Sequence, residues 1–417
     1  MPLAADFPSS DAAWQQRLAA LDPSRYAKTR NHLNGAVSRL SPYITHGYLS
    51  LREAVEGVRA RHRLGPDDKL FSEFAWRAFF HHVWRCEGNR IFSDLRPALA
   101  GVRYATHMPA DILEGRTGLA VIDQAVACLY QTGYLHNHAR MWLASYLVHL
   151  RHIHWRIGAD WMYGHLLDGD LASNHLSWQW VASTFSSKPY LFNAENVARY
   201  APASWQCGGS PLDTSYEHLE MMARGEDEAG RQRFEALASV PSRAAFALEV
   251  PELYARPPEL LSAGLYTDAQ HLLAVMGVSA AQEGPLHLDL VHAWSMVAGS
   301  RVWPSERDRP RLRVGVVHLP GRTEFPWSAR RWGFVLERFR AICDFVFVGD
   351  AAALLGALGG LNSVKIASYG QPGCPATAQV FRAAGVRQID PPAFLTEPSR
   401  PCRSFSQFIR AVDLVVQ

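Results

Sequence analysis

The stretch from residue 134 to residue 180 constrains this chain most, because polar side chains recur at helical spacing inside apolar surroundings. Its first half reads YLHNHARMWLASYLVHL. There Asn137, Arg140 and Met141 lie three and four positions apart, so a helix places them on one face. This half therefore predicts a helix with a polar face set into an apolar background.

The second half of the stretch predicts another helix with the same property. A break is expected at Ile157-Gly158, followed by a turn at Asp168-Gly169-Asp170. From that turn onward, Asp170, Asn174 and Trp178 follow at i, i+4 and i+8, which aligns them along one helix face.

These polar groups need partners if they are buried. Two carboxylates, two amides and a guanidinium are costly to desolvate unless they pair with one another or with a polar ligand. The ligand that suits them is large and flat, with an anionic tail and an edge that both donates and accepts hydrogen bonds.

Length and composition limit the class of protein. A chain of 417 residues with 48% hydrophobic and 19% charged residues is long enough for two or three domains and is not expected to be disordered. The net charge of +3 means that nucleic-acid binding requires a local basic patch. The six cysteines lack metal-ligand spacing, so we expect no metal and a reducing compartment. Neither a signal-peptide pattern nor an apolar run of about 18 residues is visible, so a cytoplasmic protein is expected.

The order and gaps of several motifs resemble the flavin-binding helical domain of the photolyase and cryptochrome family. The resemblance runs from about Tyr26 to about Tyr200. The motifs that carry it are His136-Asn137-x-x-Arg140-Met141, Trp155, Asp168-Gly169-Asp170-Leu171-Ala172-x-Asn174 and Trp178-Gln179-Trp180.

The resemblance implies FAD as cofactor and assigns residues to it. The implied cofactor-binding residues are Tyr26, Ser38, Arg39, Leu40, Ser41, Asn137, Arg140, Asp168, Asp170 and Asn174. Backbone amides and hydroxyls near a helix N-terminus suit the diphosphate, although helix capping alone also explains Ser38 and Ser41. Val37 departs from the family pattern, which usually has a threonine there.

The resemblance also implies a pocket for a flipped pyrimidine dimer and a route for electrons. The implied substrate-binding residues are Arg30, Glu73, Trp76, Arg77, Asn137, Met141 and Trp180. The implied catalytic residues are Glu73, Asn174, Trp155 and Trp178, the two tryptophans as electron relays. By pattern alone, residues 70–84 also read as an amphipathic core helix with a solvated glutamate. The family's distal tryptophan has no counterpart, which leaves Tyr104, Trp142 or Trp161 as candidates.

The second half of the chain predicts a different architecture. Four short apolar runs between residues 287 and 369 alternate with helical segments at 327–342 and 351–358, which is typical of a parallel α/β sheet. The expected organisation is a mainly helical FAD-binding domain of photolyase type (1–205), a helical linker region (206–282) and a smaller Rossmann-like α/β domain (283–417). The last part resembles the family's antenna domain in permuted order, with an unrelated α/β module as the alternative. A second, antenna chromophore of unknown identity would belong there.

The resemblance implies a light-driven, FAD-dependent lyase that repairs cyclobutane pyrimidine dimers in damaged DNA, acting as a monomer away from membranes. A cryptochrome-like blue-light photoreceptor that binds FAD without repair is the alternative. A light-independent flavoprotein on the same scaffold is the third reading.

Overall fold

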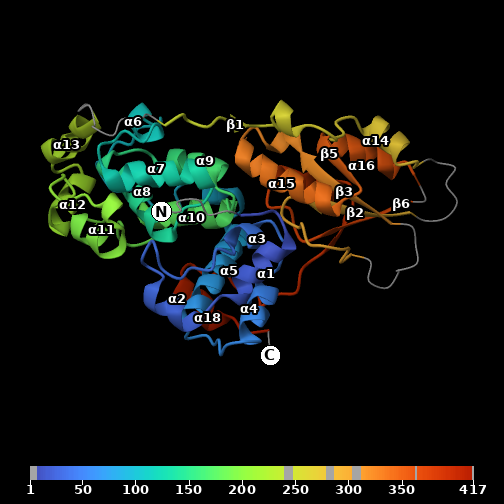
Figure 1. Cartoon of the computed structure of the whole chain (residues 1–417), viewed down its shortest axis with the longest axis horizontal. Coiled ribbons are helices and arrows are strands. Elements are labelled where there is room, and N and C mark those ends of the chain that lie inside the picture. The colour runs from blue at the N-terminus through green and yellow to red at the C-terminus, as the bar shows by residue number, and fades with distance from the viewer. Residues whose placement is uncertain (1–6, 239–247, 279–285, 303–310, 362–363, 416–417) are drawn as a thin grey trace.

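The computed structural model describes residues 7–238, 248–278, 286–302, 311–361 and 364–415. Helices dominate the first part of the chain, and a parallel sheet forms later, beside them (Figure 1). The expected order of a mainly helical part followed by an α/β part is therefore confirmed. The domain boundaries stay predictions, and the one expected at 282/283 lies outside the described residues.

The helical part is built from helices of unequal length around one long member, α5. Its helices are α1 (Asp11–Ala19), α2 (Pro23–Thr29), α3 (Ser41–Thr45), α4 (Leu51–Arg59), α5 (Lys69–Glu87), α6 (Ala110–Leu113), α7 (Ala120–Thr132), α8 (Asn137–Ser145), α9 (Trp155–His165), α10 (Leu171–Val181), α11 (Ala194–Tyr200), α12 (Tyr216–Ala223) and α13 (Glu228–Ala238). Short 3-10 turns lie at Gly88–Phe92 and Ala203–Trp205, and a π-helical turn at Tyr146–Leu150 follows α8.

Local sequence sets the ends of the helices that matter for the site. Helix α10 begins after Asp170, whose carboxylate accepts a hydrogen bond from the backbone N–H of Ser173 at 2.7 Å. Helix α7 ends at Gly133, which adopts a left-handed φ of 65°. The chain can then turn directly into α8, which carries Asn137 and Arg140.

The break expected at Ile157-Gly158 is wrong, because α9 runs through both residues. Gly158 instead allows close packing of α9 on α10. A Cβ atom added to Gly158 would lie 2.3 Å from Cη2 of Trp178 and 3.1 Å from Cδ2 of Leu147. The helix is interrupted earlier, by the π turn and by His152, which has a positive φ of 47°.

Gly158→Ala is expected to destabilise the protein by about 1–3 kcal/mol, because the added methyl overpacks a close helix–helix contact. The matched control is Gly356→Ala, since Gly356 also lies inside a helix but has open space where a Cβ would stand. The control is expected to stabilise the protein by about 0.5–1 kcal/mol through helix propensity. Urea unfolding measures both, and equal effects of the two changes would contradict the packing argument.

The later part of the chain forms a five-stranded sheet in which every pair is parallel, in the order β5-β3-β2-β6-β7. Its strands are β2 (Leu286–His292), β3 (Arg311–His318), β5 (Phe345–Gly349), β6 (Val364–Tyr369) and β7 (Arg387–Ile389). The four apolar runs are thus confirmed as strands. The sequence gives no apolar signal for β7, an edge strand whose residues are largely exposed.

Helices cover both faces of this sheet. Helices α14 (Ala269–Val275), α16 (Ala351–Gly359) and α17 (Pro375–Ala383) share a core with one face. Helix α15 (Ala329–Ile342) packs on the other face, in the core that it shares with α4 and α5. A small antiparallel pair joins β1 (Leu253–Tyr254) to β4 (Trp327–Ser328), and 3-10 turns lie at Glu259–Leu261 and Leu319–Gly321.

Ion pairs and a returning C-terminal segment tie the α/β part to the helical part. Arg338 of α15 pairs with Asp11 at 2.8 Å, and Arg331 donates to the carbonyl of Tyr163 at 2.8 Å. After β7 the chain crosses back, and α18 (Phe405–Ala411) packs against α5 (Figure 1). Within the described residues, no helix is both long and apolar enough to cross a bilayer.

Candidate active site

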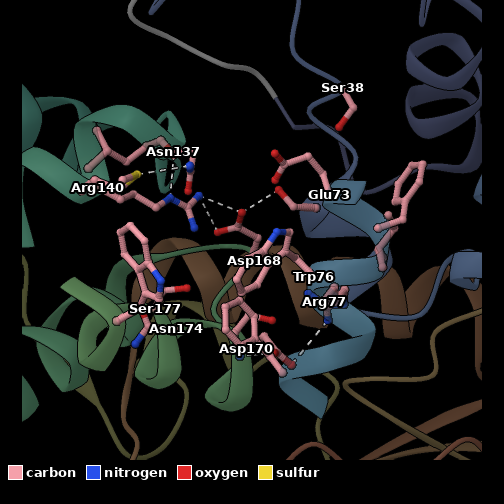
Figure 2. A pocket seen from close by; sticks show the side chains of 18 of the residues that line it. Ser38, Glu73, Trp76, Arg77, Asn137, Arg140, Asp168, Asp170, Asn174 and Ser177 are labelled. Carbon is pink, nitrogen blue, oxygen red and sulfur yellow. Dashed lines mark hydrogen bonds and ion pairs between the residues drawn. The ribbon is translucent and has the colours of Figure 1, made fainter. Parts of the chain in front are cut away.

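A cavity of about 520 Å³ lies among α3, α5, α8, α9 and α10. This volume is within the range of roughly 300–1,000 Å³ that is typical of small-molecule sites. Figure 2 shows Asn137 and Arg140 on one side of the cavity and Glu73, Trp76 and Arg77 on the opposite side, with Asp168 between them and Asp170, Asn174 and Ser177 below. The predicted residues that line it are Tyr26, Arg30, Ser38, Ser41, Glu73, Trp76, Arg77, Asn137, Arg140, Met141, Asp168, Asp170, Asn174, Trp178 and Trp180.

An ion pair between Arg140 and Asp168 crosses the cavity (Figure 2). One terminal nitrogen of Arg140 donates to both carboxylate oxygens of Asp168, at 3.0 and 2.8 Å. The Arg140 Nε also donates to the carbonyl of Leu135, and the hydroxyl of Ser41 donates to Asp168 at 2.6 Å. Burial opposes the charge of Arg140, but Asp168 more than offsets this and raises the Arg140 pKa. Arg140 is therefore charged, and these hydrogen bonds fix the pair in place.

Two polar groups on α10 leave hydrogen-bonding capacity facing the cavity. The side-chain NH₂ of Asn174 donates to the carbonyl of Ala159 at 2.8 Å. This bond fixes the amide orientation, so Oδ1 of Asn174 is the atom left to accept a hydrogen bond from a ligand. The buried hydroxyl of Ser173, which also lines the cavity, has no hydrogen-bond partner among the residues that the structure describes.

Asp170 is held by the protein on several sides. It caps α10, and its Oδ2 lies 3.0 Å from Nε2 of His81 and 3.4 Å from a guanidinium nitrogen of Arg77. Burial opposes ionisation, but the charges of His81 and Arg77 and the hydrogen bond from His81 hold the Asp170 pKa well below its usual range. Asp170 thus anchors α10 to α5 at the floor of the cavity.

Asp170→Asn is expected to lower the free energy of unfolding by about 1–3 kcal/mol near neutral pH, because it removes charge-assisted bonds. The Asp170 pKa is lowered in the folded state, so its contribution is complete above the ordinary carboxyl pKa of 3.8 and is lost as pH falls through the lowered value. Urea unfolding of wild type and variant at several pH values measures this. A stability difference that stays constant into strong acid would contradict the assignment.

Glu73 lies on the opposite wall, on α5. It accepts a hydrogen bond from Arg30 at 2.8 Å, and its side chain is 38% exposed. Burial of the carboxyl raises the pKa of Glu73, and the charges of Arg30 and Lys69 only partly oppose this. A raised pKa keeps more of this carboxyl protonated near neutral pH, and a protonated carboxyl can donate a hydrogen bond.

Aromatic and apolar side chains make up the rest of the wall. Trp76 and Trp180 come from different helices, α5 and α10, and Met141 comes from α8. Trp178 lines the cavity as well and is almost fully buried. The cavity therefore combines a charged, amide-rich part with flat apolar surfaces.

Three predicted residues do not line this cavity. The side chain of Arg39 is exposed, Leu40 is fully buried in the core, and Trp155 lies deeper in the helical part. Arg39 has a positive φ of 49° and lies two residues before the start of α3. The indole N–H of Trp155 donates to Asp94 at 2.6 Å.

Sequence reasoning missed several residues of this cavity. Examples are Phe80 and Ser177, which line it, and His81, which holds Asp170. Helical spacing could have found the first two, because Phe80 is i+4 from Trp76 and Ser177 is i+3 from Asn174. His81 carries no signal of its own, because nothing in the amphipathic helix that residues 70–84 predict sets this histidine apart.

The cavity fits a flavin dinucleotide by the chemistry of its donor set. A fixed cation beside a fixed carboxylate, an amide oxygen left as acceptor and an unpaired hydroxyl suit a polar heterocyclic edge. The apolar surfaces of Met162 and Trp178 suit a flat ring system. Among the residues that the structure describes, no three His, Cys, Asp or Glu side chains gather in a way that could hold a metal ion.

Comparison with known proteins places this site in a family context. Residues 70–203 match the family described as the FAD binding domain of DNA photolyase. The deoxyribodipyrimidine photo-lyase of Streptomyces griseus is 38% identical over 149 residues, which cover 36% of this chain and 32% of the relative. A cryptochrome DASH of Ostreococcus tauri is 33% identical over 189 residues, covering 43% and 34%. The crystal structure of a Synechocystis cryptochrome matches 47% of this chain and 44% of that chain, with 27% identity and a TM-score of 0.43.

Residues 70–203, which include most of the helices around the cavity, are thus similar to the FAD-binding domain of DNA photolyase. The expected relationship to the photolyase and cryptochrome family is thereby confirmed. The matching segments span about a third of the length of the curated relatives, and the α/β part lies outside the matched family region.

Proposed function

We propose that this protein is a light-driven, FAD-dependent lyase that splits cyclobutane pyrimidine dimers in DNA. The observation that carries the proposal is that one cavity is lined both by the Arg140–Asp168 pair and by Glu73, Trp76 and Trp180. A site that only held a cofactor would not need a second, aromatic wall with a carboxyl on it. Relatives named deoxyribodipyrimidine photo-lyase support the same conclusion.

The residues of α8, α9 and α10 hold the cofactor in this proposal. Arg140 and Asp168 fix the polar edge of the flavin ring through the charged pair, and Ser173 donates its free hydroxyl proton. Asn174 Oδ1 accepts a hydrogen bond from a protonated ring nitrogen, because its NH₂ is already bound to Ala159. Bound FAD, when reduced, supplies an electron after it absorbs light.

The residues of α5 and the end of α10 hold the damaged bases. A dimer extruded from the helix loses its stacking, and the faces of Trp76 and Trp180 replace part of that energy. The raised pKa of Glu73 favours the protonated carboxyl more than in an ordinary glutamate, and in that form the carboxyl donates a hydrogen bond to a pyrimidine carbonyl and stabilises charge that develops there. Asn137 and Met141 border the same space from α8.

Two arginines expected on DNA phosphate have different surroundings. Arg30 pairs with Glu73 in the absence of DNA, so phosphate binding by Arg30 would release the carboxyl for the dimer. Arg77 is bound to Asp170 in the cavity floor. We therefore assign Arg77 to the support of α10 and keep Arg30 as the phosphate contact.

We assign re-reduction of the cofactor to Trp178 and Trp155, with Tyr104 as the distal member. The ring of Tyr104 lies 6.4 Å from His154, whose ring lies 5.7 Å from Trp155. Trp142 and Trp161 form other contacts, to Asn196 and Tyr130.

The alternative is a cryptochrome-like photoreceptor that keeps FAD but does not repair DNA. One observation favours it: the carboxyl of Glu73 accepts a hydrogen bond from Arg30. As long as that pair persists, the carboxyl is not available to donate a hydrogen bond to a substrate. Both functions need the same cofactor site. They differ in whether the aromatic side chains Trp76 and Trp180 bind a damaged base.

A repair assay separates the two. The purified protein with reduced flavin is illuminated in the presence of an ultraviolet-damaged oligothymidine, and recovery of thymine absorbance is followed. We expect recovery in the light and none in the dark control. No recovery with flavin that is fully reduced would overturn the repair proposal and favour the receptor.

A further inference from the structure

The C-terminal segment of the chain supplies an aromatic partner to the cavity. Phe405 lies at the start of α18, and its ring stacks on the ring of Trp76 with centroids 4.1 Å apart and planes 6° apart. Trp76 also lines the cavity. Phe405 lies about 200 residues beyond the end of the matched family region, so that match gives no reason for this contact.

Several contacts anchor the segment that carries Phe405. Phe408 packs on Phe79 of α5 with ring centroids 5.6 Å apart. The backbone N–H of Cys402 donates to Nε2 of His82, and the other ring nitrogen of His82 lies 2.6 Å from Glu397. These contacts lie on the same helix as Trp76, so α18 is fixed to the wall of the cavity independently of the aromatic stack.

We propose that Phe405 is a positioning residue for binding of the damaged bases. This inference rests on the proposed repair function. Stacking on Phe405 covers one face of Trp76 and restricts rotation of the indole. The Trp76 indole is then preorganised, with its opposite face available to a flipped pyrimidine. Binding therefore does not have to supply the free energy that fixes the indole. The α/β part of the chain thus completes the damaged-base site through its returning C-terminal segment.

The opposite role is physically distinct and gives the opposite sign. If Phe405 occupied the face on which the dimer stacks, the segment would block the site. Removal of the aromatic ring would then strengthen binding of damaged DNA. The sign of the effect therefore decides between support and blockage.

The test compares Phe405→Leu with Phe405→Tyr and Ile409→Ala. Leucine at position 405 keeps an apolar side chain but cannot stack on Trp76, whereas tyrosine retains the aromatic ring. Ile409 is a partly buried residue of the same helix and serves as the control. The measurement is the equilibrium affinity of the flavin-loaded protein, in the dark, for an oligonucleotide with one thymine dimer and for its undamaged counterpart. We expect Phe405→Leu to lose about 3- to 10-fold in affinity for the damaged strand only. Phe405→Tyr and Ile409→Ala are expected to bind like wild type.

Each other outcome overturns the inference. Unchanged or tighter binding by Phe405→Leu removes the positioning role, and an equal loss in Ile409→Ala shows a merely structural one. An equal loss for both oligonucleotides shows a general effect on DNA binding. A wild-type protein that does not distinguish damaged from undamaged DNA refutes the proposed function itself, which separates that failure from the failure of Phe405.

Discussion

Asp168→Ala is expected to yield a protein that purifies with little or no flavin and unfolds more easily than wild type. Asp168 is the only carboxylate shown bound to Arg140 in the described structure, and it accepts two contacts from that guanidinium and one from Ser41. Its removal leaves a cation facing the cavity without its counter-charge. Breaking a buried pair costs about 3–5 kcal/mol, and the 24% exposure of Arg140 places the expected loss at the lower end. Flavin content by absorbance and thermal unfolding measure the two effects.

The matched control for this prediction is Glu56→Ala. Glu56 also bonds an arginine, Arg52, at 2.7 Å, but it does not line the cavity and its side chain is 45% exposed. We expect a small loss of stability, below about 1 kcal/mol, and an unchanged flavin content. Normal flavin retention by Asp168→Ala, or flavin loss by both variants, would contradict the role given to the Arg140–Asp168 pair.

The α/β part illustrates what sequence patterns predict well. Buried parallel strands are apolar throughout, so β2, β3, β5 and β6 stand out as short apolar runs between helices. The edge strand β7 does not, because its residues are exposed and its pairing to β6 is decided by the neighbouring strand rather than by its own composition. The helical part gives a similar lesson at Gly158, where a glycine signals a close approach of two helices and not a break.

The sequence predicts site residues that follow helical spacing along one helix. It does not predict ion pairs between residues of elements that are distant in the sequence. Asn137, Arg140 and Asn174 line one cavity as their spacing implied. The pairs Arg30–Glu73 and Arg77–Asp170 join residues that are 43 and 93 positions apart. No local pattern encodes such separations, because they depend on how the helices pack.

The returning C-terminal segment lay beyond prediction for a related reason. Phe405–Ala411 form a short helix, and nothing in their sequence identifies α5 as the surface that this helix covers. The structure shows that a segment from the end of the chain reaches a residue of the candidate active site. Domain boundaries drawn along the sequence would assign these two contacting residues to different units.

Glu73→Ala is expected to lower the yield of dimer repair by about 10²-fold without loss of flavin. Glu73 lines the cavity on α5, whereas the residues proposed to fix the cofactor lie on α8, on α10 and in the turn between α9 and α10. Without the Glu73 carboxyl, no hydrogen bond stabilises the negative charge that develops on the pyrimidine carbonyl, so repair slows. The contacts proposed for the cofactor do not involve Glu73 and stay intact. The repair assay and the flavin absorbance of the purified variant measure the two properties separately.

The pH dependence of repair gives a sharper test of the same residue. Because the pKa of Glu73 is raised in the folded protein, the protonated, donating form persists below that value and is lost as pH rises through it. Wild-type repair is therefore expected to decline over an interval above the ordinary carboxyl pKa. Glu73→Gln keeps a neutral donor that does not titrate, so its repair is expected to be lower than that of wild type in acid but flatter across about pH 5 to pH 9.

Glu87→Gln is the matched control for these measurements. Glu87 lies at the end of the same helix and pairs with Arg90 at 2.7 Å, far from the cavity lining. Its variant is expected to retain both the repair yield and the pH profile of wild type, since a surface pair contributes little. Loss of flavin in Glu73→Ala would move Glu73 from the substrate side of the cavity to the cofactor side. A pH profile that Glu73→Gln leaves unchanged would assign the titration to another group, and the carboxyl would then act by shape and not by its proton.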